Sequence, residues 1–272
     1  MSRLPQITSG AAAAQRKLLI PYLVAGDPDL ETTLALMHEL VAQGADIIEL
    51  GIPFSDPASD GPVIQQAVER ALAGKTTLQD TLELVRRFRS QDEATGIVLM
   101  GYLNPIEIMG YKRFVELATE VGVDGVLVVD MPPAESTQLH QELRRAGLDT
   151  IYLVAPTTTA TRAKGIVGHC SGYLYYVSLK GVTGAALIDQ DSVARSLGEL
   201  RKITDLPIMI GFGIKDAASA SAMARHADGI IIGSALVGRI AALTRDSQAD
   251  AGTLTDTCAI IGVAREAIDN LN

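Results

Sequence analysis

The sequence predicts a fold of the α/β class, a single (β/α)8 TIM barrel, from two features of the chain. Eight apolar runs of strand length alternate with segments of helical composition, and this alternation is typical of a parallel sheet covered by helices. The 272 residues also lie near the ~250 residues typical of a closed barrel of this kind. An open doubly wound sheet is the alternative, but no GxGxxG pattern follows the first apolar run, so its dinucleotide-binding form has no support.

The expected strands are short and apolar, as strands buried on both faces require. In chain order they are placed at residues 18–25, 45–51, 97–103, 123–129, 150–154, 173–179, 207–212 and 229–233. Residues 1–14 are expected to form an extra helix that covers the bottom of the barrel. After the first strand, Asp27 and Pro28 predict a helix start, because a capping residue is followed by proline at the first helical position.

Helical periodicity predicts the segments between the strands. Leu30, Leu34 and Met37, for example, recur at the spacing of one helix face. Two helical stretches follow the second strand, and a polar stretch at 244–253 precedes a last helix after the eighth, so extra helical segments are expected after strands 2 and 8. Because no linker interrupts the alternation, we predict one domain, residues 1–272.

Composition narrows the classes of partner. The chain carries 23 basic and 32 acidic residues, a formal net charge of −9, which argues against nucleic acid or an anionic membrane as the general partner. An anionic ligand must therefore be held by local geometry, with backbone donors.

The cysteines and histidines predict no metal site. Cys170 and Cys258 stand far apart in no metal-ligand spacing, which suits a reducing compartment, and no run has the length of a signal core or membrane span. We therefore expect a cytoplasmic protein. The four histidines fall in helical segments away from the strand ends: His38, His140, His169 and His226.

Glu49 is an acid within the apolar second strand, where an ionised side chain costs several kcal/mol unless it is paired or protonated. A structural ion pair is one interpretation. The other is a proton shuttle with a raised pKa, working beside Asp60 in the following loop, whose more polar setting keeps it ionised to stabilise a developing positive charge. Asp56 and Asp130 are interpreted as turn residues, Asp130 with a weaker catalytic option.

Three glycine-bearing loops follow the last three strands: GVTGA (181–185), GFGI (211–214) and GSALV (233–237). Glycines commonly just end strands, but barrel phosphate sites form after strands 7 and 8, where backbone N–H groups bind an anion without a lysine. Three such loops in succession favour a phosphorylated substrate, with Gly213, Gly233 and Ser234 as donors.

The sixth strand and its loop carry further candidates. Tyr175 fits either core packing or the site, because tyrosines also flank it. Lys180, at the end of the strand, is placed where a Schiff-base nucleophile could be activated by burial.

Five of these segments, in order, closely resemble the tryptophan synthase alpha chain family, from about residue 15 to the end. They are ELGIPFSDPASDGPVIQ (49–65), YLNPI (102–106) and the three glycine-bearing loops. The resemblance implies a lyase that cleaves indole-3-glycerol phosphate to indole and glyceraldehyde 3-phosphate by a retro-aldol reaction, in the last steps of L-tryptophan biosynthesis.

The resemblance also implies roles for residues. Glu49 would be the acid and base, Asp60 would pair with the indole N–H, and Tyr175 would be an active-site tyrosine. The implied substrate- and phosphate-binding residues are Tyr22, Thr183, Gly184, Gly211, Gly213, Gly233 and Ser234. This chain would need no cofactor, and the partner would be a beta chain carrying pyridoxal phosphate in an α2β2 complex that passes indole through a tunnel.

Two departures from the family pattern leave alternatives open. Tyr22 stands where phenylalanine is expected near the indole, and SLKG (178–181) replaces an SRxG form. Lys180 therefore keeps a class I aldolase of a phosphorylated sugar as one alternative, which borohydride would trap with substrate. A catalytically silent barrel that activates a partner is the other.

Overall fold

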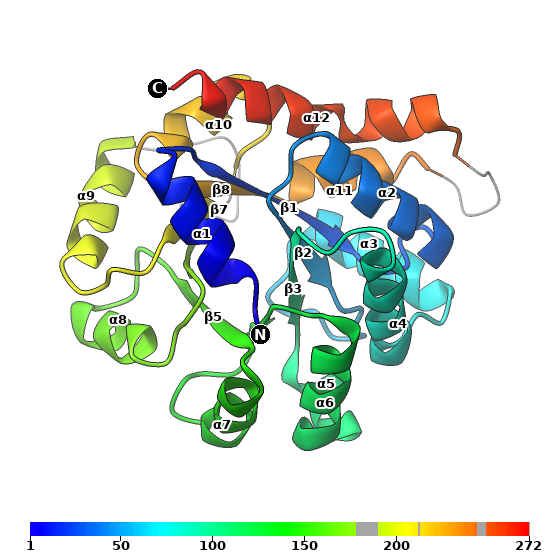
Figure 1. Ribbon diagram of the computed structural model, residues 1–272, viewed down its shortest axis with the longest axis horizontal. Helices are drawn as coiled ribbons and strands as arrows, with labels where there is room; N and C mark the ends of the chain where they lie inside the picture. The colour runs from blue at the N-terminus through cyan, green and yellow to red at the C-terminus, as the bar shows by residue number, and fades with distance from the viewer. Residues whose placement is uncertain (178–189, 212, 244–248, 272) are drawn as a thin grey trace.

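Eight parallel strands close into a barrel in chain order in the computed structural model, which describes residues 1–177, 190–211, 213–243 and 249–271 (Figure 1). The strands are β1 (Leu18–Val24), β2 (Ile47–Gly51), β3 (Gly96–Gly101), β4 (Gly125–Val128), β5 (Asp149–Val154), β6 (Leu174–Val177), β7 (Ile208–Gly211) and β8 (Gly229–Ile232). Every strand lies inside one of the expected apolar runs or begins one residue before it. The predicted fold class is confirmed, and the open doubly wound sheet is wrong because β8 pairs with β1.

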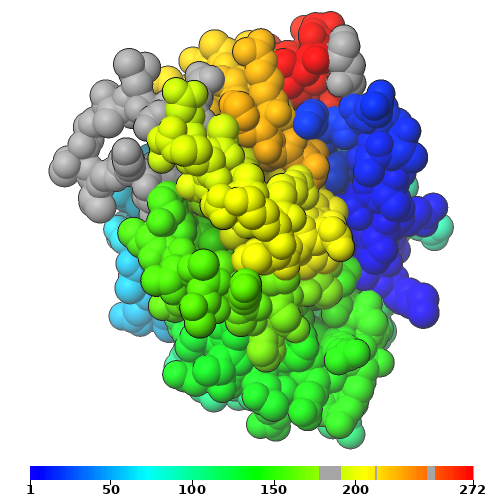
Figure 2. All heavy atoms as spheres, turned by 90° about the vertical axis from the view of Figure 1, so that its left-hand side faces the viewer, coloured from blue at the N-terminus to red at the C-terminus, as the bar shows by residue number. Residues whose placement is uncertain are grey.

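The helices lie around the barrel (Figure 1), and the face seen in Figure 2 is covered largely by the green to yellow segments that include α7, α8 and α9. They are α1 (Leu4–Ala13), α2 (Leu30–Ala42), α3 (Pro62–Ala73), α4 (Leu78–Arg89), α5 (Leu103–Met109), α6 (Tyr111–Val121), α7 (Thr137–Ala146), α8 (Ala160–Val167), α9 (Gln190–Arg201), α10 (Ala217–Ala224), α11 (Ser234–Ile240) and α12 (Ala251–Asp269). The extra helical segments expected after strands 2 and 8 are present. An additional one, α5, follows β3 and was not predicted.

The start of α2 corrects one prediction. The helix is capped by Asp29, whose side chain accepts a hydrogen bond from Thr32 N at 2.8 Å, and not by Asp27 with Pro28 at the first helical position. Asp27 is instead buried and accepts hydrogen bonds from Nε and Nη2 of Arg70 on α3, at 2.7 and 2.9 Å. Its carboxylate therefore joins the loop after β1 to helix α3.

The barrel interior is filled by alternate residues of the strands. One buried cluster takes in Leu18, Ile47, Val98 and their counterparts on other strands, together with Leu4 of α1. A Cβ on Gly96, the first residue of β3, would lie 3.0 Å from Leu4 Cδ2, so this strand start leaves room for the helix. The amino-terminal end of the barrel is thereby packed, and the carboxyl ends of the strands remain for a site.

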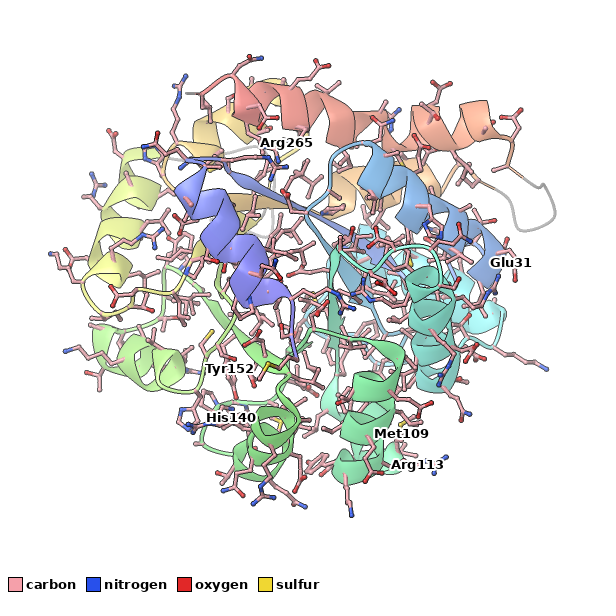
Figure 3. The ribbon with its side chains drawn as sticks, viewed as in Figure 1. Glu31, Met109, Arg113, His140, Tyr152 and Arg265 are labelled. Carbon is pink, nitrogen blue, oxygen red and sulfur yellow. The ribbon has the colours of Figure 1, made fainter. Side chains whose placement is uncertain are left out.

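The last helix fixes the chain end onto the barrel. Arg265 of α12 points inward (Figure 3), where its Nη2 donates to Lys17 O at 2.9 Å and its Nη1 pairs with Asp46 Oδ2 at 3.2 Å. None of the described helices is both long and apolar enough to span a bilayer.

Candidate active site

Side chains from β1, β2 and β6 and from the loop after β2 converge inside the barrel mouth. Tyr22 of β1 lies in register with Glu49 of β2. The pKa of Tyr22 is raised well above its usual value, by burial first and then by the negative charges of Asp60 and Glu49, with smaller effects of Tyr102 and Tyr175. The residues that the sequence singled out therefore act on one another at close range.

Glu49 is fully buried and forms no ion pair within the described part of the chain. The hydroxyl of Tyr173 donates a hydrogen bond to Glu49 Oε1 at 2.6 Å, while Oε2 is buried and has no hydrogen-bond partner among the described residues. Burial raises the pKa of Glu49 to about 7, against the opposing effect of the Tyr173 hydrogen bond. No ion pair among the described residues therefore accounts for this carboxyl group, which can change protonation near neutral pH.

The raised pKa makes stability depend on pH in a defined direction. Because the folded-state pKa of about 7 lies above the ordinary 4.5, burial favours neutral Glu49, and its contribution is fully present below pH 4.5 and is lost as pH rises through 7. At roughly 1.4 kcal/mol per pKa unit, the free energy of unfolding of the wild-type chain should fall by about 3 kcal/mol relative to that of Glu49→Gln over this range. Urea unfolding of both proteins at several pH values measures the difference, and a constant difference would contradict the buried proton.

Asp60 is held by Tyr102, a residue that the sequence analysis did not select. The Tyr102 hydroxyl donates to Asp60 Oδ2 at 3.1 Å and accepts from Ser59 N at 2.9 Å. Burial raises the pKa of Asp60, and the Tyr102 hydrogen bond opposes that rise. The ring of Phe54 lies 5.4 Å from that of Tyr102. Because its hydroxyl contacts both Ser59 N and Asp60 Oδ2, Tyr102 fixes both the loop backbone and the carboxylate.

Two glycines at the barrel mouth make room for two tyrosine rings. A Cβ on Gly51 would lie 2.4 Å from the Tyr22 hydroxyl, and a Cβ on Gly211 would lie 2.4 Å from the Tyr175 hydroxyl. Burial, and then the Glu49 charge, raise the pKa of Tyr175 well above its usual value. Tyr175 therefore lies at the mouth with Glu49, which favours a place in the site over a purely core role.

The described parts of the glycine-bearing loops present accessible backbone. Gly213 is exposed with φ +74°, a left-handed conformation that favours glycine. Gly233 precedes α11, and Ser234 is its first, exposed residue, whose N–H has no partner inside a helix. These backbone groups suit an anion.

Other predicted residues lie elsewhere or outside the described residues. Asp56 is exposed and accepts a hydrogen bond from the Ser55 hydroxyl at 2.5 Å, as a turn residue can. Asp130 Oδ1 accepts from Leu103 N at 2.8 Å, so it links the segment after β4 to the start of α5. Thr183, Gly184 and Lys180 lie outside the described residues. In the ranges that the structure describes, no three His, Cys, Asp or Glu side chains gather as a metal site would require.

Comparison with known proteins agrees with this geometry. The sequence profile of the tryptophan synthase alpha chain family matches residues 9–263. The tryptophan synthase alpha chain of Thioalkalivibrio sulfidiphilus is 52% identical over 99% of this chain and 100% of its own length. That of Neisseria meningitidis is 52% identical over 93% and 97%.

Solved structures give the same result. The crystal structure of tryptophan synthase subunit alpha from Legionella pneumophila superposes with a TM-score of 0.90 at 43% identity, covering 99% of each chain. A chain of Mycobacterium tuberculosis tryptophan synthase in its aminoacrylate-bound form superposes with a TM-score of 0.85 at 32% identity, covering 98% of this chain and all of that one. The chain belongs to the tryptophan synthase alpha chain family.

Proposed function

We propose that the chain is the lyase subunit of a tryptophan synthase and cleaves indole-3-glycerol phosphate to indole and glyceraldehyde 3-phosphate. The observation that carries the proposal is the buried Glu49, which has one oxygen without a partner in the part of the chain that the structure describes and a pKa raised to about 7. A group of this kind suits both donation and removal of a proton near neutral pH. Family membership supplies the substrate and the pathway, the last steps of L-tryptophan biosynthesis.

The reaction needs only proton transfers and charge stabilisation from this chain. Protonated Glu49 gives its proton to indole C3, which makes the ring nitrogen an iminium, and the Asp60 carboxylate stabilises that positive charge at the N–H. The Glu49 carboxylate then takes the proton of the C3′ hydroxyl. The C3–C3′ bond breaks, its electrons neutralise the iminium to give indole, and C3′ becomes the aldehyde carbon of glyceraldehyde 3-phosphate. Glu49 ends protonated, ready for the next turnover.

The remaining candidates would bind the substrate. Tyr22, which is buried, and Tyr175, which is half-buried, would form the wall for the indole ring beside Glu49. Backbone donors near Gly211, Gly213, Gly233 and Ser234 would hold the phosphate, as a net charge of −9 requires. Thr183 and Gly184 would belong to a loop that closes over the ligand, and the Thr183 hydroxyl would then donate to Asp60 in the closed state.

The proposed partner is a beta chain that carries pyridoxal phosphate, in an α2β2 complex that passes indole through a tunnel. The loop at 52–62 and α5 lie at the carboxyl ends of the strands, and Ile108 of α5 is 80% exposed, a large apolar side chain for an interface to cover. Contact there and at Asn104 would order the Asp60 loop. We expect the complex to work in the cytoplasm, a reducing compartment that suits the free Cys170 and Cys258.

The purified chain should release indole from indole-3-glycerol phosphate, and a beta chain should raise the rate about 5- to 150-fold. That range corresponds to roughly 1–3 kcal/mol of coupling spent on ordering the site. Indole formation, with the beta chain titrated to saturation and serine withheld, measures both rates, and glycerol 3-phosphate should compete with the substrate.

Thr183→Val is the informative variant in this assay, because it keeps the side-chain shape and removes the hydroxyl. It should lower both the rate and the fold activation by the beta chain. Equal fold activation of wild type and variant would show that the partner does not act through this residue. No indole from wild type in either state would contradict the proposed function, and covalent trapping of the substrate by borohydride would favour a Schiff base instead.

A further inference from the structure

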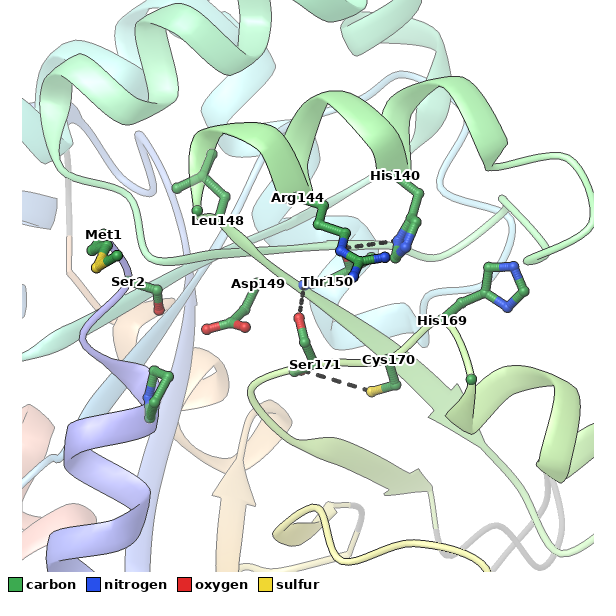
Figure 4. Close-up of a pocket in the computed structure, with 13 residues that line it drawn as sticks. Met1, Ser2, His140, Arg144, Leu148, Asp149, Thr150, His169, Cys170 and Ser171 are labelled. Carbon is green, nitrogen blue, oxygen red and sulfur yellow. Dashed lines mark hydrogen bonds between the residues drawn. The ribbon is translucent and has the colours of Figure 1, made fainter.

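A second pocket lies at the opposite end of the barrel from Glu49, where β5 begins (Figure 4). It has a volume of about 470 Å³ and is bounded by α7, the start of β5, the segment between α8 and β6, and the first residues of the chain. This size lies within the range of small-molecule sites, ~300–1,000 Å³. Neither the lyase reaction nor the proposed partner surface uses it.

One wall carries a carboxylate without a partner. Asp149, the first residue of β5, is only 9% exposed, and its Oδ2 is buried. Its carboxylate accepts no hydrogen bond or ion pair from any described residue, although Figure 4 shows it directed into the pocket near Ser2. A buried carboxylate without a donor costs free energy that a hydrogen bond from a bound cation would recover.

The other wall gathers groups that are cationic or donate hydrogen bonds. Arg144 of α7 has no ion-pair partner among the residues whose placement the structure gives, whereas the adjacent Arg145 pairs with Glu142 at 2.9 Å. The ring of His140 lies 5.5 Å from that of His169. Burial, then the electrostatic effects of His169 and Arg144, lower the pKa of His140. These three side chains line the same part of the pocket, and such a group of side chains suits an anion.

The two walls belong to one continuous pocket. Thr150 joins them, because its Oγ1 lies 3.4 Å from His140 Nδ1 and its backbone follows Asp149 directly. The Thr150 N–H donates a hydrogen bond to the Ser171 hydroxyl at 3.0 Å, so this backbone group already has a partner. The buried Asp149 carboxylate and the exposed Arg144 side chain therefore carry opposite charges and lie on opposite sides of the pocket.

We propose that this pocket binds a small zwitterion, a free α-amino acid, with its ammonium group at Asp149 and its carboxylate group at Arg144 and His140. A simple anion would leave the Asp149 carboxylate unpaired, and a simple cation would leave Arg144 without a counter-charge. Only a ligand with both charges satisfies both walls. Leu148 and Pro5, which also line the pocket, supply apolar surface for a side chain.

The test is isothermal titration calorimetry of the full-length chain with the twenty common L-amino acids in turn, and with acetate and methylammonium. At least one amino acid should bind, and its affinity should fall about tenfold or more in Asp149→Asn and in Arg144→Gln, as expected for loss of a charged hydrogen-bond partner. Arg145→Gln is the matched control on the same helix and should bind as wild type does. Because Arg144 is exposed, its variant keeps the test valid even where Asp149→Asn folds poorly.

Three results would overturn the proposal. The first is that no amino acid binds with a dissociation constant below about 10 mM. The second is that acetate or methylammonium binds as tightly as the best amino acid, which would leave only a simple ion site. The third is that the amino acid binds elsewhere. Binding that Arg144→Gln leaves unchanged, or displacement of the amino acid by glycerol 3-phosphate, would show this.

Discussion

Glu49→Gln should reduce the rate of indole release by about 10²- to 10⁴-fold, the usual contribution of general acid–base catalysis. The amide has nearly the shape of the carboxyl group, and its oxygen can still accept the hydrogen bond that Tyr173 donates to Oε1. It can neither give a proton to indole C3 nor take one from the C3′ hydroxyl. The measurement is kcat at saturating indole-3-glycerol phosphate with the beta chain in excess.

The control for this variant is Glu39→Gln on α2. Glu39 accepts a hydrogen bond at 2.8 Å from Gln43, the residue that caps the end of α2. This contact lies outside the barrel, so kcat should stay within about twofold, as for an ordinary surface change. Glu49→Gln should also bind glycerol 3-phosphate as wild type does, which shows that the site is intact. A loss in kcat smaller than about tenfold would remove Glu49 from the proposed role.

Asp60→Asn should reduce kcat by about 10²-fold, comparable with removal of one group that stabilises charge in a transition state. The asparagine amide keeps the shape of the carboxyl group. Its oxygen can still accept the hydrogen bond that the Tyr102 hydroxyl donates to Asp60 Oδ2 in the wild-type chain. It lacks the negative charge that the iminium requires. The same assay measures the effect, and the substrate KM should change less than kcat, because the charge develops only during the reaction.

Asp56→Asn is the matched change in the same loop. Asp56 is exposed and contacts the Ser55 hydroxyl, so in an assay of the chain alone, without the beta chain that this loop would contact, its charge should matter little and kcat should be close to that of wild type. If Asp60→Asn turned over substrate as fast as Asp56→Asn, the charge-stabilising role of Asp60 would be wrong.

The strands and the central acid could be predicted from the sequence because both depend on local patterns. Buried parallel strands are continuous apolar runs, and Glu49 stands out within one of them. The tyrosines that act on the two carboxylates could not be predicted. Tyr173 lies 124 positions from Glu49 and Tyr102 lies 42 from Asp60, and in an apolar run a tyrosine has the same pattern as core packing.

The errors in helix assignment have a similar cause. Asp27 and Asp29 are both suitable caps by residue type, and the choice between them depends on Arg70, which the fold brings to Asp27 from α3. That Asp149 lacks a partner among the described residues could not be predicted either, since a carboxylate before an apolar run is an ordinary strand start. Gly172, where a Cβ would lie 3.1 Å from Asp149 Cβ, lets the chain pack closely against it.

The most direct test of the account is the pH dependence of kcat/KM, which reports groups of the free enzyme, in wild type and in Tyr173→Phe. Glu49 must be protonated to begin the reaction, so kcat/KM of wild type should fall as pH rises through about 7. The Tyr173 hydrogen bond lowers the pKa of Glu49, so its removal should move this fall to higher pH, while ionisation of the substrate phosphate affects both enzymes equally. A profile that stays level through pH 7, or a fall that moves to lower pH in Tyr173→Phe, would contradict the assignment of Glu49 as the acid that starts cleavage.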